Sequence, residues 1–399
     1  MRILHLEEFF HPDAGYQVNM LSRLQVAEGH QVTVVAAELE RMPPTLTTFF
    51  GMEDIASRDA EFTRSTGVDI IRIPLYGYYS GRAIFHPRVF GAVSRSRPDI
   101  VLVHAMETLT GMLFVWFSKR FNFPIALDSH MLEMATRNRF SKSFTNFYRR
   151  FVTPKILREQ IPVIRVVDTD YVQKLLGIPL EATELSSFGT DTSHFSPDAE
   201  VRVVARERLG LSQSGFVVMY AGKLDEAKGA SLLARAVEAR FDAASGREIE
   251  FLIIGNSDGD YGSSVEAQFR RSGNKLVRLP TQRFFDLASF YRAADLAVFP
   301  RQCSLSFFEA QACGLPVLFE ENEINVQRAA FGNARTFRPG DVADLRAKID
   351  EFANLSSDRI NAMRVNARNH VLKDYNFLPV ARRLTSILEL AAARWRRLG

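Results

Sequence analysis

The chain has 399 residues, of which 46% are hydrophobic and 24% charged, and its formal net charge is +4 at pH 7. Length and composition predict a globular protein of two domains with a substantial core. The charge is too small to indicate nucleic-acid binding by itself. Two cysteines, Cys303 and Cys313, exclude a secreted disulfide framework. Without a matching cluster of histidines they also argue against a structural zinc site, and we expect a reducing compartment.

The N-terminal segment MRILHLEEFF lacks the apolar region of a signal peptide. The most apolar stretch of the first half runs from Thr108 to Phe117, about half of the roughly 20 residues that a membrane span needs. It is interpreted as a buried core helix. We therefore expect a cytoplasmic protein, with peripheral association at the inner face of the plasma membrane left open.

The first half reads as alternating strands and helices. A short strand over residues 2–6, a helix over 18–28 closed by Gly29, and a strand over 31–38 form a βαβ unit. Parallel strands buried on both faces read as continuous apolar runs. Four further runs have this character: residues 69–75, 99–105, 124–130 and 162–168.

The pattern restarts after a segment rich in turn-forming residues, 187–200, which is typical of a linker. The sequence therefore predicts two Rossmann-like, doubly wound α/β domains facing a cleft. Residues 1–190 form the first and residues 191–375 the second, and a C-terminal helix over 376–399 is expected to pack back on the first. Ligands of such sheets bind beyond the carboxyl ends of the strands, which makes the cleft the first place to look for function.

Glu309 stands at the front of the apolar stretch FFEAQACGLPVL. Together with Ser306 it fits a capping box, Ser-x-x-Glu, which explains the carboxylate by about 1 kcal/mol of helix stability. A carboxylate at the start of this helix could equally bind a ligand. The residues alone leave both interpretations open.

Two lysines flank the loop of YAGKLDEAKG, in which Gly222 ends a strand, Lys223 follows it directly and Lys228 precedes the next helix. Lysine is a compact point charge suited to phosphate oxygens, and a following helix adds backbone amides. The alternative is a pair of solvated surface lysines.

Two other strand ends carry candidate site residues. Gly15, in HPDAGYQ, permits close approach of a ligand to the backbone, although a plain turn is an equally simple interpretation. The pattern G-x-G-x-x-G is absent from the sequence, which argues against a nicotinamide or flavin dinucleotide. His130 ends the run PIALDSH, where it is either a site residue or a structural histidine.

The segment from Arg137 to Arg158 holds seven basic residues, no acidic residue and five interleaved aromatic residues. Such a segment could lie on an anionic membrane surface. The alternative is an ordinary helix that packs its aromatic rings inward and exposes its charges.

Taken in order, these motifs resemble the retaining glycosyltransferases of family four, also called glycosyl transferases group 1, which have the two-domain GT-B fold. The resemblance covers most of the chain. It rests on PDAGYQVNMLSRLQVAEGHQVTVVA, DSH at 128–130, FGTDTSHFSP, YAGKLDEAKG, FLIIGN, and FYRAADLAVFP followed by FFEAQACGLPVL.

The resemblance implies a site for a nucleotide-sugar. The glutamate matching Glu309 holds the ribose hydroxyls, and amides near Ser304, Leu305 and Ser306 face the diphosphate. The cations matching Lys223 and Lys228 neutralise that diphosphate, so that no metal is needed, and the histidine matching His130 lies near the transferred sugar. Gly15 and Gly222 match the family's donor-binding glycines. No cofactor is implied beyond a UDP- or GDP-sugar as co-substrate.

The sequence also departs from the family pattern. Arg301 stands where the family has the first glutamate of E-x7-E, which contacts the donor sugar. Lys223 stands where arginine is common, so the charge is kept but the bidentate fork is lost. Ala14 precedes Gly15 where two glycines are usual.

The expected function is a retaining, metal-independent glycosyltransferase that acts on a glycan or lipid-linked acceptor in bacterial cell-surface polysaccharide synthesis, such as that of lipopolysaccharide. Two alternatives remain open. One is a nucleotide-sugar epimerase on the same fold, and the other is a non-catalytic protein that binds nucleotide-sugar. No nucleic-acid partner is expected.

Overall fold

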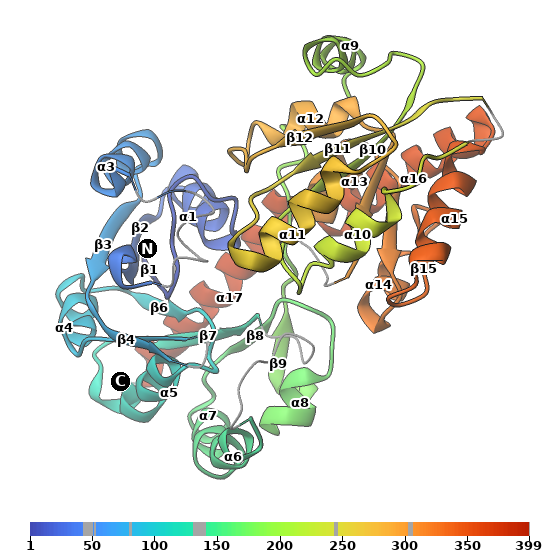
Figure 1. The fold of residues 1–399 in the computed structure, drawn as a ribbon. Helices are drawn as coiled ribbons and strands as arrows, with labels where there is room; N and C mark the ends of the chain where they lie inside the picture. The colour runs from blue at the N-terminus through green and yellow to red at the C-terminus, as the bar shows by residue number, and fades with distance from the viewer. Residues whose placement is uncertain are drawn as a thin grey trace. The chain divides into compact units, whose positions relative to one another are not determined.

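The computed structural model describes residues 1–42, 51, 53–79, 82–130, 141–242, 246–301 and 306–398. The chain divides into two compact units (Figure 1). The first comprises Met1–Phe188 and Leu378–Gly399, and the second comprises Gly189–Phe377. Each contains a parallel sheet flanked by helices, which confirms the predicted α/β class.

The first unit is built on a seven-stranded sheet with the order β3-β2-β1-β6-β7-β8-β9, and every neighbouring pair in it is parallel. Its strands are β1 (Arg2–Glu7), β2 (Gln31–Ala37), β3 (Asp69–Ile73), β6 (Ile100–Val103), β7 (Ile125–Ser129), β8 (Val163–Arg165) and β9 (Thr183–Leu185). A short antiparallel pair, β4 (Leu75–Tyr79) and β5 (Arg82–Phe85), lies outside this sheet.

Helices and helical turns connect these strands. They are α1 (Gln17–Ala27), a turn at Leu39–Arg41, α3 (Ile55–Thr66), α4 (Arg88–Arg95), α5 (Leu109–Phe117), a turn at Ser118–Arg120, α6 (Ser141–Phe147), a π-helical turn at Tyr148–Val152, α7 (Thr153–Glu159), α8 (Tyr171–Leu176) and a turn at Leu180–Ala182. Helix α1 ends as predicted: Gly29 has φ +89° and its amide donates to the Val26 carbonyl at 2.9 Å.

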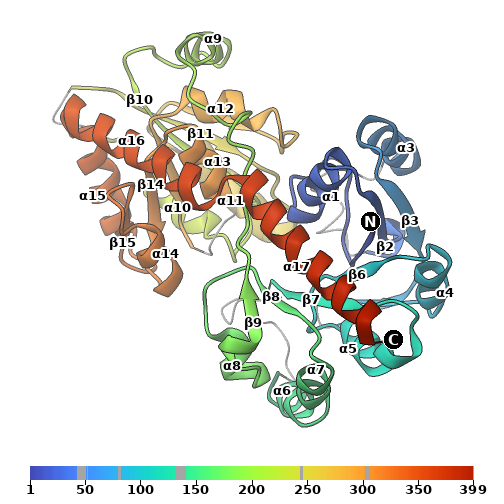
Figure 2. The same ribbon diagram turned by 180° about the vertical axis from the view of Figure 1, so that it is seen from behind.

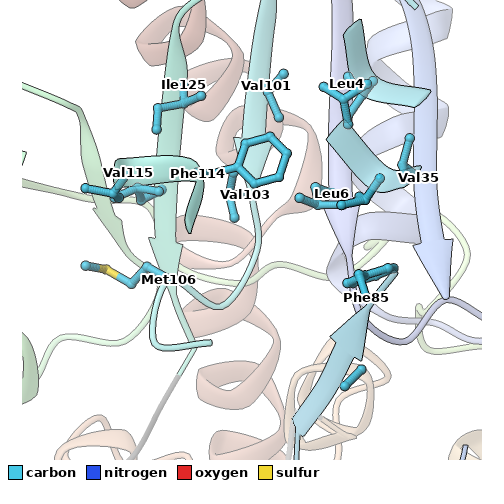
Figure 3. Close-up of a cluster of buried hydrophobic side chains, with 14 of the residues drawn as sticks. Leu4, Leu6, Val35, Phe85, Val101, Val103, Met106, Phe114, Val115 and Ile125 are labelled. Carbon is cyan, nitrogen blue, oxygen red and sulfur yellow. The ribbon is translucent and has the colours of Figure 1, made fainter. Parts of the chain in front are cut away.

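The core of the first unit lies on the central strands (Figure 3). Leu4 and Leu6 of β1 and Val101 and Val103 of β6 are at most 2% exposed, because these strands are covered on both faces. Phe114 of α5 packs against them.

Helix α5 differs from its prediction as a wholly buried core helix. Its N-terminus is capped by the Thr108 hydroxyl, which accepts from the Gly111 amide at 2.9 Å. Phe114 and Val115 are buried, but Leu109 is 42% exposed and Trp116 51% exposed. The helix therefore covers the sheet with one face and presents apolar side chains on the other. No helix in the described part of the chain is both long and apolar enough to cross a membrane.

The second unit is built on a six-stranded parallel sheet with the order β12-β11-β10-β13-β14-β15. Its strands are β10 (Phe216–Ala221), β11 (Ile249–Ile254), β12 (Leu276–Leu279), β13 (Leu296–Phe299), β14 (Val317–Glu320) and β15 (Ala334–Phe337). Its helices are α9 (Ala199–Arg208), α10 (Ala230–Ala236), α11 (Gly259–Arg270), α12 (Leu287–Ala293), α13 (Ser306–Ala312), α14 (Glu323–Arg328), α15 (Val342–Ala353) and α16 (Ser357–Asp374).

A buried charge cluster ties two helices to this sheet. Asp295, just before β13, contacts Arg202 and Arg206 of α9 at 2.8 and 2.6 Å and Arg364 of α16 at 2.6 Å. The Val217 amide donates to the same carboxylate at 2.9 Å. Burial alone would raise the pKa of Asp295, but the three guanidinium groups lower it below its usual value.

The last helix, α17 (Phe377–Leu398), is grouped with the first unit from Leu378 onward (Figure 2). Leu384 and Leu388 are fully buried. Arg382 pairs with Glu28 at the end of α1 at 2.6 Å. The Thr385 hydroxyl lies 3.2 Å from the side-chain amide nitrogen of Gln25. The C-terminal residues thus contribute both apolar and polar contacts to the first unit.

Candidate active site

In the first unit, polar side chains gather where β1, β6 and β7 end. These strands are neighbours and parallel, so their carboxyl ends lie on one edge of the sheet. His104 and Glu107 follow β6, and Asp128 and His130 lie at the end of β7. This is the edge at which open α/β sheets bind ligands.

Asp128 is the centre of this group. Its side chain is 0% exposed. One carboxylate oxygen, Oδ1, accepts from the Ala105 amide at 3.0 Å. The other, Oδ2, lies 2.6 Å from His104 Nδ1 and 2.8 Å from His130 Nε2. Burial acts to raise the pKa of Asp128, but the two imidazole rings lower it well below its ordinary value.

The backbone at Ala105 has an unusual conformation, in which its amide donates to this carboxylate. Ala105 has φ +57°, a left-handed conformation that side chains other than glycine rarely adopt. Its amide points at Asp128 Oδ1, and the Met106 amide donates to the Asp128 carbonyl at 2.9 Å. A strained residue is thus retained where it supplies hydrogen bonds to a buried charge.

His130, the predicted site histidine, is the partly open member of the group, with a side chain 26% exposed. Its ring packs edge-on against Phe188 at a centroid distance of 5.4 Å. Burial alone would lower its pKa, but the carboxylates of Asp128, Glu7 and Glu107 raise it to about 8. The imidazole is therefore charged at neutral pH.

Two further histidines, which were not singled out in the sequence, extend this group into the interior. His104 Nε2 lies 3.0 Å from His5 Nδ1, and His5 Nε2 lies 2.7 Å from Oε1 of Gln25. All three side chains are buried. Burial and the neighbouring His104 lower the pKa of His5 to about 3. The available signal was one histidine in each of two apolar runs, within RILHLE and near the end of DIVLVHA.

Two buried carboxyl groups on the same edge have spare hydrogen-bonding capacity. Glu107 accepts from the Ser129 hydroxyl through Oε1. Within the described residues, Glu107 Oε2 and Glu8 Oε1 have no hydrogen-bond partner. Burial raises the pKa of both groups, that of Glu8 to about 7 despite Arg82 at 3.7 Å. Such oxygens are suited to the hydroxyl groups of a polar ligand.

His104, Asp128 and His130 also form the group of described side chains whose ligand atoms lie close enough to hold a metal ion, within 4.8 Å of one another. Two of the separations argue for direct contact instead. Ligands held at about 2.1 Å around a tetrahedral ion are roughly 3.4 Å apart. The separations of 2.6 and 2.8 Å are those of an N–H group donating to a carboxylate.

In the second unit, the loops that follow β10 and β11 touch through their backbones. A Cβ atom on Gly255 would lie 1.8 Å from the Gly222 carbonyl oxygen. Glycine is therefore required at residue 255 for the two strand ends to approach so closely.

The two candidate lysines lie in the loop that follows β10, and both are half-buried. The Lys228 amide donates to Asp225 at 2.9 Å, and the Lys223 carbonyl accepts from the Tyr220 hydroxyl at 2.6 Å. Arg301, just beyond β13, donates to the Glu226 carbonyl of the same loop at 3.1 Å. The carboxyl ends of β10 and β13 thus carry three cations, and the backbone at Gly222 closely approaches that at Gly255.

Glu309 lies in the first turn of α13 and is 6% exposed. Burial raises its pKa to about 8, although its own amide and the Thr190 hydroxyl act in the opposite direction. Ser306 is the first residue of α13, whereas Ser304 and Leu305 lie outside the described residues, as does Cys303. Both roles proposed for Glu309, cap and ligand-binding group, stay predictions.

Gly15 lies in the turn between β1 and α1, on the ligand-binding edge of the first sheet. The turn is held by the Ala14 amide, which donates to the His11 carbonyl at 3.0 Å, and by Asn19, which donates to the same carbonyl at 2.9 Å. The structure therefore places Gly15 and His130 on one sheet edge, and Gly222, Lys223, Lys228 and Glu309 in the second unit.

The described part of the basic and aromatic segment forms α6, the π-helical turn and α7; residues 137–140 lie outside the description. Tyr148 is fully buried and Phe144 packs on the core. Phe147 and Phe151 instead contact each other at a centroid distance of 5.1 Å and are 47% and 48% exposed. The aromatic residues therefore split between the core and the surface.

Comparisons with known proteins agree with this division. Residues 14–159 match the model of the glycosyl transferase 4-like domain, and residues 215–354 match that of the glycosyl transferases group 1. Together the two models cover more than two thirds of the chain, one in each unit. The chain belongs to the glycosyltransferases of family four. The predicted resemblance is confirmed.

Relatives with a curated name include D-inositol 3-phosphate glycosyltransferases. That of Xylanimonas cellulosilytica is 32% identical over 181 residues, 42% of this chain and 40% of the relative. An enzyme of this name from Catenulispora acidiphila is 26% identical over 316 residues, 69% of this chain and 71% of the relative. The chain thus spans less than half the length of the first of these family members.

Solved structures share the whole architecture. A glycosyltransferase from Rickettsia africae aligns with a TM-score of 0.75 at 13% identity and covers 98% of each chain. The Anabaena protein HepE in complex with UDP aligns with a TM-score of 0.72 at 16% identity, over 98% of this chain and 100% of that one. At such identities the likeness establishes the fold, which is GT-B as predicted for this family member.

The raised pKa of His130 predicts a pH-dependent contribution to stability. Its pKa rises from 6.5 in the unfolded chain to about 8 in the folded one. The stability contributed by the charged ring is therefore complete below pH 6.5 and is lost as the pH rises through 8. We expect the difference in unfolding free energy between the wild type and His130→Gln to shrink between pH 6 and 9 in urea titrations. A difference that stays constant over this range would contradict the assignment.

Proposed function

We propose that this family member is a retaining glycosyltransferase that transfers a sugar from a UDP- or GDP-sugar, without a metal ion, to a glycan or lipid-linked acceptor. The observation that carries the proposal is the loop between Gly222 and Gly229 in the second unit, where Lys223 and Lys228 follow the carboxyl end of β10. Family membership supplies the reaction class. The bound UDP named for Anabaena HepE, which shares only the fold, fits the proposed donor.

The chemistry of the leaving group gives the lysines their role. Transfer of the sugar leaves negative charge on a nucleoside diphosphate, and preorganised cations that meet this charge stabilise the transition state. Lys223, Lys228 and Arg301 supply three such cations at the ends of β10 and β13. Because they offset the diphosphate charge directly, we propose that they take the part that a divalent ion plays in metal-dependent transfer.

Glu309 is proposed to bind the ribose. A buried carboxyl group with a pKa of about 8 is largely neutral at pH 7 in the free protein. Two ribose hydroxyls that donate to its oxygens favour the ionised form. The two roles of Glu309, helix cap and ribose-binding group, are therefore compatible, because only the ribose-binding role requires the ligand.

The first unit is proposed to bind the acceptor and to place His130 beside the transferred sugar. The spare oxygen of Glu107 and that of Glu8 offer acceptors for sugar hydroxyls. A charged imidazole at His130 donates to an oxygen of either substrate and does not act as the base while it is protonated. The retaining outcome follows the family and is part of the proposal.

The acceptor is proposed to lie at the inner face of the plasma membrane, as in bacterial cell-surface polysaccharide synthesis. Phe147 and Phe151 are half-exposed side by side. Arg149, Arg150 and Arg158 are exposed on the same stretch. Exposed aromatic rings beside cations fit an anionic lipid surface.

A panel of nucleotides tests the donor site. We expect UDP, GDP or one of their sugars to raise the melting temperature selectively, in the presence of EDTA as well as in its absence. At about 100 times its dissociation constant a ligand adds about 2.7 kcal/mol of stability. Lys228→Ala should weaken this shift, whereas Lys348→Ala on α15 should not.

The same panel separates the alternatives. No shift from any nucleotide would overturn the proposed site. Conversion of the donor in the absence of an acceptor would indicate an epimerase, and binding without turnover of donor in the presence of acceptors would indicate a non-catalytic protein.

Proton release tests the role of Glu309. Nucleotide-sugar binding at pH 7 should ionise this carboxyl group and release up to one proton, so that the calorimetric enthalpy differs between phosphate and Tris buffers. Affinity should accordingly increase as the pH rises toward 8. In Glu309→Gln the proton release should vanish. An equal release from the wild type and the variant would assign the proton to another group and leave Glu309 as a helix cap.

Vesicle binding tests the membrane surface. We expect the protein to sediment with vesicles that contain anionic lipid more than with neutral ones, because apolar and electrostatic contacts add. The double variant Phe147→Ser with Phe151→Ser should lose most of this binding. The matched control replaces Val203 and Val204 of α9, which are 51% and 63% exposed, by serine. Equal sedimentation of the protein with both kinds of vesicle would contradict the proposal.

A further inference from the structure

We infer that His104 is a positioning residue for His130, acting through Asp128, and that the buried chain Gln25–His5–His104 sets how it does so. The inference rests on the proposed role of His130 in transfer. Its direct observation is the unbroken series of close contacts from Gln25 to His130: 2.7, 3.0, 2.6 and 2.8 Å.

The shared oxygen of Asp128 fixes one proton on each ring. A carboxylate oxygen only accepts, so a ring nitrogen at hydrogen-bond distance must donate. His104 Nδ1 and His130 Nε2 both face Oδ2 and must both carry a hydrogen. The two imidazoles therefore compete for one oxygen, and each limits the position of the other.

The far end of the chain decides the charge of His104. Gln25 presents Oε1 to His5 Nε2, so this nitrogen donates and His5 Nδ1 accepts from His104 Nε2. With the Gln25 amide in this orientation, the hydrogen bonds place a hydrogen on both nitrogens of His104.

If the Gln25 amide is turned by 180°, Gln25 donates to His5 and His5 donates to His104. His104 then carries a hydrogen on Nδ1 alone and is neutral. Thr385 tolerates either orientation, because a hydroxyl group both donates and accepts. The charge of His104 is thus coupled to the orientation of one buried amide.

This coupling reaches His130 through charge as well as position. A charged His104 ring and the His130 ring both interact with the negative charge of Asp128. Without a charged ring at residue 104, that negative charge would act on His130 alone. Removing His104 should therefore raise the pKa of His130 and free its ring to turn. The titratable groups that face His130 or His104 are Glu7, Glu107, Asp128 and His5.

The experiment uses the full-length chain with two substitutions at one position. Asn places an amide nitrogen where His104 has Nδ1, so His104→Asn keeps the donor to Asp128 and cuts the link to His5. His104→Leu removes both. His370→Asn is the matched control, because His370 is a buried histidine paired with Asp374 at 3.5 Å in the second unit.

The first readout is the titration of the His130 ring followed by NMR, which requires no activity. We expect the midpoint to move upward in His104→Leu, by less in His104→Asn, and not at all in His370→Asn. An unchanged midpoint in His104→Leu would overturn the inference whether or not the protein transfers sugar.

The second readout is kcat/KM for transfer against pH. We expect His104→Leu to lose roughly tenfold to hundredfold through misplacement of His130, with an alkaline shift of the profile, and His104→Asn to recover most of the rate. Nucleotide-induced thermal shifts should be unchanged in both, which verifies the fold. A loss of kcat/KM in His104→Leu without a shift of the pH profile, and without recovery in His104→Asn, would mean that His104 has a purely structural role.

Metal analysis of the purified protein completes the test. The short N···O separations predict no stoichiometric metal. One metal ion per chain that is lost in His104→Leu would overturn the inference and assign His104, Asp128 and His130 to a metal site.

Discussion

One fully buried carboxylate organises the first domain. Asp128 has no access to water, and an isolated buried charge of this kind is costly unless it is paired and hydrogen-bonded. Its partners come from β6 and β7 and from a strained residue, Ala105. The requirement to satisfy Asp128 thus fixes the ends of two strands, and His130 is held at the edge of the site as a consequence.

The second domain has the same architecture, but its strand ends carry a different set of groups. Its strand ends carry Lys223, Lys228 and Arg301, a set of positive charges that fits the proposed nucleotide-sugar. Gly255 allows the backbones at residues 222 and 255 to touch. Arg301 holds the loop that carries Lys223 and Lys228 by donating to its Glu226 carbonyl. The arginine that stands where the family usually has a glutamate therefore has a structural role in the loop proposed to face the diphosphate, besides adding charge.

Sequence patterns predicted the elements well because parallel strands buried on both faces are unmistakable runs, such as ILHL at the start and FVVMYA at residue 216. His130 follows such a run, but it was the family resemblance that predicted it as a site residue. The patterns missed His5 and His104 because a lone histidine within an apolar strand carries no sign of its partner. His5 and His104 are 99 residues apart in the chain and meet only because β1 lies beside β6. The order of strands in a sheet cannot be read from the local sequence pattern.

The prediction for helix α5 was wrong for a related reason. Apolar residues all round indicate burial, yet this helix lies at the surface and exposes Trp116.

The two sheet edges differ in how their charge responds to conditions. In the second domain the pKa of the Glu309 carboxyl group lies near 8, so the proposed binding of the ribose by this group depends on pH. In the first domain the charge resides on imidazoles, and that of His130 changes near the same pH. Raising the pH through 8 therefore favours the ionised form of Glu309, the group proposed to bind the ribose, and removes the proton from His130. Opposed titrations of this kind produce a bell-shaped dependence of kcat/KM on pH. Its maximum should lie near the shared value of about 8, because one group must lose its proton and the other must keep it.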